Sequence, residues 1–93
     1  MKSTYSQSSD FVNVTILLEK PVKLAHIDGV YQKWSWEGIS GESILFDKAA
    51  KKMSDDELKR AVQADYHLVD FDALTIAHKK GGLRCVNFNF KTN

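Results

Sequence analysis

Cysteine, proline and long apolar runs are scarce in this chain, and each shortage narrows what the protein can be. The one cysteine, Cys85, cannot form a disulfide within the chain, which predicts a reducing, cytoplasmic location. No apolar run is longer than Ile16-Leu17-Leu18, whereas a membrane-spanning helix needs roughly 20 apolar residues. The N-terminal segment lacks the apolar core of a signal peptide. We therefore expect neither a membrane span nor export.

An excess of charge of one sign is also missing. The chain has 13 basic and 12 acidic residues, so no overall field draws it toward nucleic acid or an anionic membrane. Its 93 residues, 43% hydrophobic and 27% charged, suit one small globular domain with a thin margin of stability. We expect residues 1–9, which are rich in serine, to form a flexible tail, and residues 10–93 to form a single domain.

Motifs that carry chemistry are absent from the sequence. It contains no P-loop, no Gly-x-Gly-x-x-Gly and no Gly-x-Ser-x-Gly pattern. The histidines lack metal-ligand spacing, because on a strand His67 points away from Asp70 and Asp72. Cys85 and His78 come close along a predicted hairpin but on opposite faces, with nothing to complete a nucleophilic site. We therefore expect no catalytic residue, no metal and no cofactor, and favour a protein that is not an enzyme.

One helix is strongly indicated, over residues 55–65. Ser54 followed by Glu57 forms a capping box, in which each side chain bonds the backbone N–H of the other residue. Met53 and Leu58 have the spacing of a hydrophobic staple across the same helix start. Acidic residues in the first turn suit the positive end of the helix dipole.

Strand patterns fill most of the remaining sequence. Residues 11–19 alternate apolar and polar side chains, and the only proline, Pro21, marks a break or an edge position. Residues 37–43 are typical of a loop, because Gly38 and Gly41 punctuate them. Further strands are predicted on both sides of Asp28-Gly29, over 43–47 and 66–71, and in a C-terminal hairpin. The sequence thus predicts an α+β fold, a largely antiparallel sheet of about six or seven strands with the helix on one face.

Two tryptophans, Trp34 and Trp36, lie in the hairpin around Asp28-Gly29. A two-residue loop leaves neither face cleanly apolar, whereas either three-residue loop places both indoles on the face of Val22 and Leu24. We favour a three-residue loop. The interpretation favoured for the indoles is burial in the core, ahead of contact with a partner or second copy and ahead of base stacking.

The C-terminal hairpin is predicted to turn at Lys80-Gly81-Gly82, which pairs Ile76 with Val86 and puts Gly82 at positive φ. A helix over 70–79 is the alternative, disfavoured because Thr75 and Ile76 prefer strands. The basic residues of this hairpin form either a solvated turn or a binding patch. The candidates for partner or ligand contact are Trp34, Trp36, Tyr31, Lys33, Lys79, Lys80 and Arg84.

These patterns favour a non-enzymatic protein that acts by binding other macromolecules. Uncovered sheet edges and a small core predict a homo-oligomer, with a dimer favoured, and leave room for a further protein partner. One alternative is a single-stranded nucleic-acid-binding module that uses the tryptophans and the basic hairpin. The other is a small-molecule-binding protein or minor enzyme, with a pocket between sheet and helix near His26, Tyr31 and His78.

Overall fold

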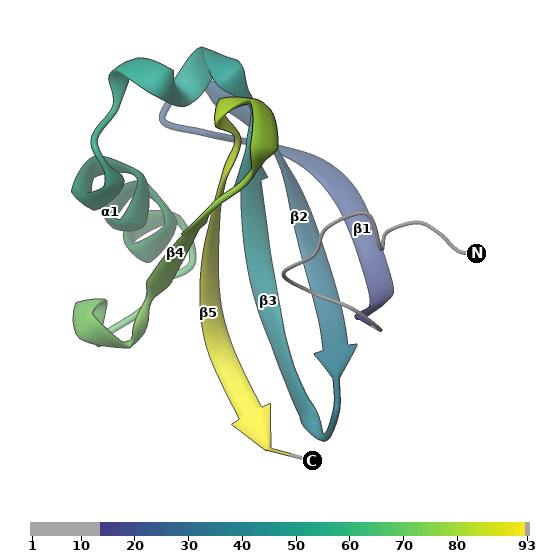
Figure 1. The fold of residues 1–93 in the computed structure, drawn as a ribbon. Coiled ribbons are helices and arrows are strands. Elements are labelled where there is room, and N and C mark those ends of the chain that lie inside the picture. The colour runs from purple at the N-terminus through teal and green to yellow at the C-terminus, as the bar shows by residue number, and fades with distance from the viewer. Residues whose placement is uncertain (1–13, 93) are drawn as a thin grey trace.

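An antiparallel sheet of five strands forms the frame of the chain in a computed structural model, which describes residues 14–92 (Figure 1). The strands lie in the order β1-β2-β3-β5-β4, so β1 and β4 are the edges. Helix α1 (Asp55–Asp65) packs against one face. The predicted α+β fold is confirmed, with five strands in the described residues instead of six or seven. The strands are β1 (Thr15–Leu24), β2 (Ile27–Trp36), β3 (Ile39–Phe46), β4 (Thr75–His78) and β5 (Arg84–Thr92).

The lower strand count has two causes. Strand β1 runs straight through Pro21, which an edge strand tolerates because the missing N–H can lie on the unpaired side. The predicted strand over 66–71 is wrong, because the chain there leaves α1 in a turn and enters a short 3-10 turn at Phe71–Ala73. The side chain of Asp70 accepts a hydrogen bond from the N–H of Asp72 and starts that turn. The predicted tail, residues 1–9, lies outside the described residues.

The first hairpin turns at a place that the sequence did not indicate. Its two turn residues are Ala25 and His26, both at positive φ (49° and 65°), and Leu24 pairs with Ile27. The predicted three-residue loop around Asp28-Gly29 is therefore wrong, and both residues lie within β2. The observed register buries Leu24 at 1% exposure, and burial outweighs the cost of two non-glycine residues in the left-handed region.

The turn of the second hairpin follows Trp36 directly. The loop predicted over 37–43 is therefore also wrong. Glu37 and Gly38 form a two-residue turn at positive φ (43° and 83°), and β3 starts directly at Ile39. Trp34 consequently pairs with Ile16 of β1 on one side and with Gly41 of β3 on the other.

The C-terminal hairpin agrees with its prediction. Ile76 pairs with Val86, and the chain turns at Lys80–Gly82, where Gly81 and Gly82 have φ of 76° and 83°. A strand, and not a helix, therefore occupies Thr75–His78.

Helix α1 has the predicted bounds and cap. The hydroxyl of Ser54 accepts from the N–H of Glu57 at 3.1 Å, and the carboxylate of Glu57 accepts from the N–H of Ser54 at 2.7 Å. Leu58 and Val62 are fully buried against the sheet. The core between helix and sheet consists of Leu24, Tyr31, Ile44, Phe46, Ala50, Leu58, Val62, Leu74, Val86 and Phe88. No helix within residues 14–92 is long and apolar enough to cross a membrane.

Candidate ligand pocket and apolar strand edge

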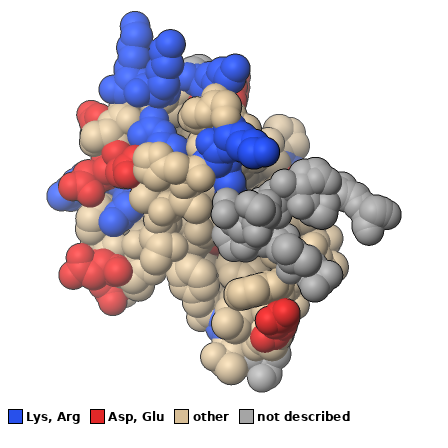
Figure 2. All heavy atoms as spheres, viewed as in Figure 1, with Lys and Arg blue, Asp and Glu red and all other residues tan. Residues whose placement is uncertain are grey.

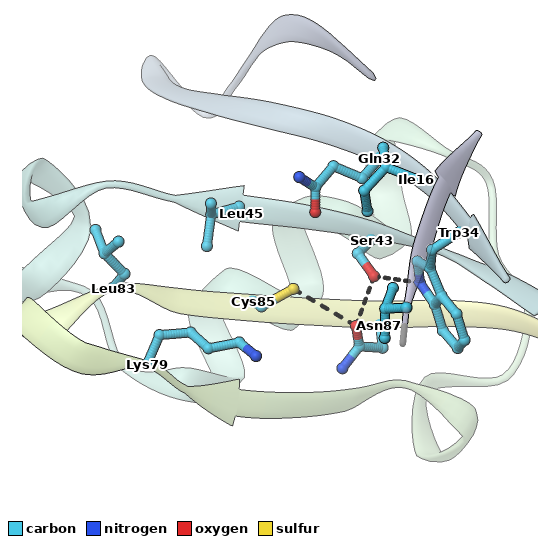
Figure 3. A pocket seen from close by; sticks show the side chains of 10 residues that line it. Ile16, Gln32, Trp34, Ser43, Leu45, Lys79, Leu83, Cys85 and Asn87 are labelled. Atoms are coloured by element: carbon cyan, nitrogen blue, oxygen red, sulfur yellow. Dashed lines mark hydrogen bonds between the residues drawn. The ribbon is translucent and has the colours of Figure 1, made fainter. Parts of the chain in front are cut away.

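The sheet face opposite α1 carries a pocket of about 320 Å³ (Figure 3). Because strand side chains alternate, the neighbours of the core residues Ile44 and Val86 point into it, among them Ser43, Leu45 and Cys85. The pocket is open on one side and mainly apolar. Its lining residues are Val14, Ile16, Gln32, Trp34, Ser43, Leu45, Lys79, Leu83, Cys85 and Asn87.

A chain of hydrogen bonds crosses the floor of this pocket. The indole Nε1 of Trp34 donates to the hydroxyl of Ser43 at 2.7 Å, and that hydroxyl donates to Oδ1 of Asn87 at 2.6 Å. The thiol of Cys85 lies 3.5 Å from the same Oδ1 (Figure 3). Ser43 is 2% exposed, and its burial is tolerated because its hydroxyl has two partners.

Burial raises the pKa of the Cys85 thiol, against the opposing effects of the Ser43 hydrogen bond and the positive charge of Lys79. A raised pKa keeps the sulfur in its neutral form, whereas a nucleophilic cysteine needs a thiolate. Cys85 therefore serves as a small apolar part of the pocket floor.

The indole of Trp34 is a wall of the pocket and is held in place from three directions. Gly41 lies directly beneath it, and a Cβ at that position would come within 2.6 Å of the indole ring. Phe90 meets the ring edge-on at a centroid distance of 6.0 Å. With its Nε1 bonded to Ser43, Trp34 is half-buried and fixed in one orientation, unlike an open stacking platform.

Two of the predicted contact residues lie inside the fold. Tyr31 is 7% exposed on the helix face, where its hydroxyl donates to Glu42 at 2.7 Å and its ring stacks on Tyr66. Burial, followed by the nearby carboxylate of Glu42, raises the pKa of Tyr31 well above its usual range. Arg84 is 8% exposed and bonds within the chain. The side chains of Tyr31 and Arg84 therefore bond to partners within the chain.

The other predicted contact residues are spread over the surface. Lys33 is exposed on β2, and Trp36 is half-buried at its end. Lys80 is exposed in the β4–β5 turn, next to the turn Lys48–Lys52, and lysines gather at that end of the molecule (Figure 2). Lys79 lines the pocket at the end away from Trp34 (Figure 3). Of the basic hairpin, Lys79 thus shares the pocket lining with Trp34, whereas Lys80 does not belong to that lining.

The pocket of about 320 Å³ lies on the sheet face opposite α1, whereas the sequence predicts one between sheet and helix near His26, Tyr31 and His78. His26 is exposed in the β1–β2 turn, His78 is exposed at the end of β4, and Tyr31 belongs to the core. None of the three lines the pocket of about 320 Å³.

An apolar strand edge, Ile16–Leu18, is the feature that sequence reasoning missed. These side chains are 45%, 58% and 48% exposed on edge strand β1, and Leu17 has no partner in β2 because the register shifts there. The available signal was that three successive apolar residues on a strand cannot all face one core.

The carboxylate of Asp55 joins α1 to the hairpin β4–β5 by contacts with an imidazole and a guanidinium. Oδ2 of Asp55 lies 3.0 Å from Nε2 of His78, and Oδ1 accepts from Nη1 of Arg84 at 3.1 Å. The hydrogen bond from His78, followed by that from Arg84, lowers the pKa of Asp55.

This lowered pKa predicts an acid-dependent loss of stability. A carboxylate whose pKa falls on folding stabilises the folded state above its unfolded pKa of about 3.9, and the contribution is lost as the pH falls through the lower folded pKa. We expect Asp55→Asn to destabilise the protein by no more than about 1 kcal/mol at neutral pH, because the side chain is 39% exposed. Urea unfolding of both proteins from about pH 6 to about pH 2 should show this difference vanish in acid. A constant difference would assign the effect to helix capping or packing.

Comparison with known proteins adds no relative: no protein-family model, no curated protein and no solved structure matches the chain. Within the part of the chain that the structure describes, no group of three or more His, Cys, Asp or Glu side chains could hold a metal ion.

Proposed function

We propose that this chain is a non-enzymatic binding protein that acts through macromolecular association, and that its partner is a second copy of itself. The observation that carries the proposal is the apolar edge Ile16–Leu18, which lies exposed on the open side of β1. An edge strand presents a row of unpaired N–H and C=O groups that another strand can pair with. Natural proteins usually blunt such edges with charge, whereas this segment carries three large apolar side chains.

Antiparallel pairing of β1 with its copy satisfies the two-fold symmetry of a dimer. In a pairing centred on Leu17, each Leu17 lies opposite its counterpart and each Ile16 lies opposite a Leu18. Pro21 follows three residues after the apolar edge and ends the pairing, because it has no N–H to donate. The bulge at Leu17 bends the strand and further limits the pairing to this short segment. A short interface of this kind is expected to give a dissociation constant on the order of micromolar.

A dimer also suits a domain of this size. A chain of 93 residues has a thin margin of stability, and burying Ile16–Leu18 adds apolar contacts that the chain cannot make alone. A cytoplasmic location is part of the proposal, supported by the single cysteine, whose buried thiol is suited to a reducing compartment.

The test is a charge placed at the centre of the proposed interface. Light scattering after size-exclusion chromatography should give the unmodified chain a mass near twice 10.5 kDa at concentrations well above micromolar. Leu17→Lys should give the monomer mass, because two desolvated ammonium groups would face each other.

Val69→Lys is the matched control, since Val69 is another apolar side chain, 97% exposed, in the segment between α1 and the turn Phe71–Ala73, outside the sheet. That variant should remain dimeric. A monomer mass for the unmodified chain across this range contradicts the proposal, and so does a dimer that Leu17→Lys leaves intact.

A further inference from the structure

We propose that one end of the molecule binds the phosphate backbone of a nucleic-acid duplex through four exposed lysines. This basic end consists of Lys48, Lys51, Lys52 and Lys80. It lies beyond the last residues of β1, whereas the apolar edge Ile16–Leu18 lies near the start of that strand. The proposal therefore goes beyond self-association, because it assigns a partner of different chemistry to a separate surface.

The register of the sheet brings three connections to the same end of the molecule. Phe46, the last residue of β3, pairs with Gly29 of β2 on one side and with Arg84, the first residue of β5, on the other. The turn of the first hairpin, the turn Lys48–Lys52 and the turn Lys80–Gly82 therefore all leave the sheet at this end (Figure 1). Lysines far apart in the sequence gather there (Figure 2).

The turn Lys48–Lys52 is held with its lysines toward the outside. Ala50 in its middle is 1% exposed, whereas its three lysines are exposed. Arg84 donates to the backbone oxygen of Ala50 from the side of the sheet and anchors the turn. A Cβ on Gly81 would lie 3.7 Å from Cε of Lys48, so the two lysine-bearing turns adjoin. Because the backbone is already fixed, binding has to order little more than the lysine side chains.

Charge is distributed unevenly along the molecule, although the total is close to zero. The segments 23–28, 47–52 and 79–82, which belong to this end, contain six lysines and two aspartates, an excess of four positive charges. The formal net charge of the whole chain is +1, so the remainder carries an excess of three negative charges. An anionic partner is therefore attracted to this end and repelled by the rest of the molecule.

The composition of the three turns favours a duplex over other polyanions. Residues 25–26, 48–52 and 80–82 are all alanine, histidine, lysine or glycine. An acidic protein partner would usually need large buried anchors, and a single strand would usually need aromatic rings for stacking. Stable attachment to a membrane needs a second signal besides charge, such as an inserted apolar group. A duplex presents one phosphate charge per about 1.7 Å of its axis and requires none of these groups.

Fluorescence anisotropy of a labelled DNA duplex of about 20 base pairs, titrated with the full chain, tests the proposal. At low salt we expect saturable binding with a dissociation constant of about 1–100 μM. Four phosphate contacts should make the logarithm of the binding constant fall with the logarithm of salt concentration at a slope of about −3.6. Absence of saturable binding at low salt, or binding that salt does not weaken, overturns the proposal.

The double variant Lys51→Gln/Lys52→Gln should weaken duplex binding about tenfold or more at low salt and reduce the size of the slope by about 2. The matched control is Lys33→Gln/Lys91→Gln, which removes the same charge from two exposed lysines of β2 and β5. The control should change binding by less than about twofold, because those lysines lie away from the three turns. Equal losses in the two double variants would show attraction to net charge alone and would overturn the basic end as the site.

Further probes distinguish the duplex from other partners. A DNA duplex of scrambled sequence and an RNA duplex should both bind within about threefold of the first, since all three present phosphates. A marked preference for one sequence would require base contacts and would contradict binding to the backbone. Tighter binding of a single strand of the same length overturns the choice of a duplex. Binding to phosphatidylserine vesicles without binding to the duplex would assign this end to membranes and overturn the proposal.

This inference and the proposed dimer can fail separately. The four lysines of the basic end belong to one chain, so a monomer that binds the duplex leaves this inference standing and contradicts only the dimer. A dimer that does not bind the duplex contradicts only this inference.

Discussion

Arg84→Met is expected to lower the free energy of unfolding by about 3 kcal/mol. Nη1 of Arg84 donates to the backbone oxygen of Met53 at 2.7 Å and to Asp55, and Nη2 donates to the backbone oxygen of Ala50. One buried guanidinium thus ties β5 to the turn Lys48–Lys52 and to the start of α1. Methionine keeps much of the volume and removes every donor, so the carbonyl of Met53 loses its guanidinium donor and that of Ala50 keeps only the N–H of Met53. Urea unfolding followed by circular dichroism measures the loss.

Two further variants distinguish this network from charge alone. Arg84→Lys keeps the positive charge, but an ammonium group cannot reproduce the fork of the guanidinium, so most of the loss should remain. Arg60→Met is the matched control: Arg60 is the other arginine of the chain, exposed over the ring of Phe71, and its loss should cost less than about 1 kcal/mol. Equal losses at Arg84 and Arg60 would show that the buried network contributes nothing of its own.

The elements that the sequence predicted correctly are those with a local chemical signal. The capping box of Ser54 and Glu57 determines where α1 begins, because only residues within one turn take part. Gly81 and Gly82 supply the positive φ that the C-terminal hairpin requires, and the pairing of Ile76 with Val86 follows from that turn. Both signals act over a few residues and need no knowledge of the rest of the fold.

The first hairpin could not be predicted in the same way. Asp28-Gly29 is the stronger turn sequence, yet the chain turns at Ala25 and His26, neither of which is among the Asn, Asp and Gly that two-residue turns favour. The register is decided by which side chains of β1 and β2 enter the core, and that depends on α1, far along the chain. Here tertiary burial overrides local turn preference. Because the register of the hairpin follows from its turn, the predicted position of Trp34 is wrong as well.

The pocket could not be predicted from the sequence either, although two of its lining residues were among the predicted contact residues. Trp34 and Lys79 were both predicted contact residues, and the pairing of β3 with β5 brings β2, which carries Trp34, and the β4–β5 hairpin, which carries Lys79, into one sheet. That pairing joins segments on either side of α1, so no local pattern reveals it. The contact candidates Tyr31 and Arg84 lie on the helix side of the sheet because their strand positions alternate with those of the pocket.

Phe88→Ala is expected to cost about 3–5 kcal/mol, a large fraction of the stability of a domain of this size. Phe88 is 1% exposed at the centre of the core and packs against Tyr66 at a ring-centroid distance of 5.1 Å. Tyr66 in turn stacks on Tyr31 at 5.9 Å, so three aromatic rings connect β5, the end of α1 and β2. Truncation at Phe88 removes the buried ring, leaves a cavity and loosens the aromatic contacts that dock the helix.

The neighbouring Phe90 offers a control of the same residue type on the same strand. It is 45% exposed and meets Trp34 edge-on, so Phe90→Ala should cost no more than about 1.5 kcal/mol. If Phe88→Ala fails to fold, Phe88→Leu keeps the chain measurable and should still lose about 1 kcal/mol or more, because leucine fills only part of the space. Chemical unfolding of the three variants measures their free energies of unfolding, and that of Phe88→Ala should be lower than that of Phe88→Leu. Losses of equal size at Phe88 and Phe90 would mean that the helix does not depend on the aromatic contacts beneath it, and that the core between α1 and the sheet is held by its aliphatic residues.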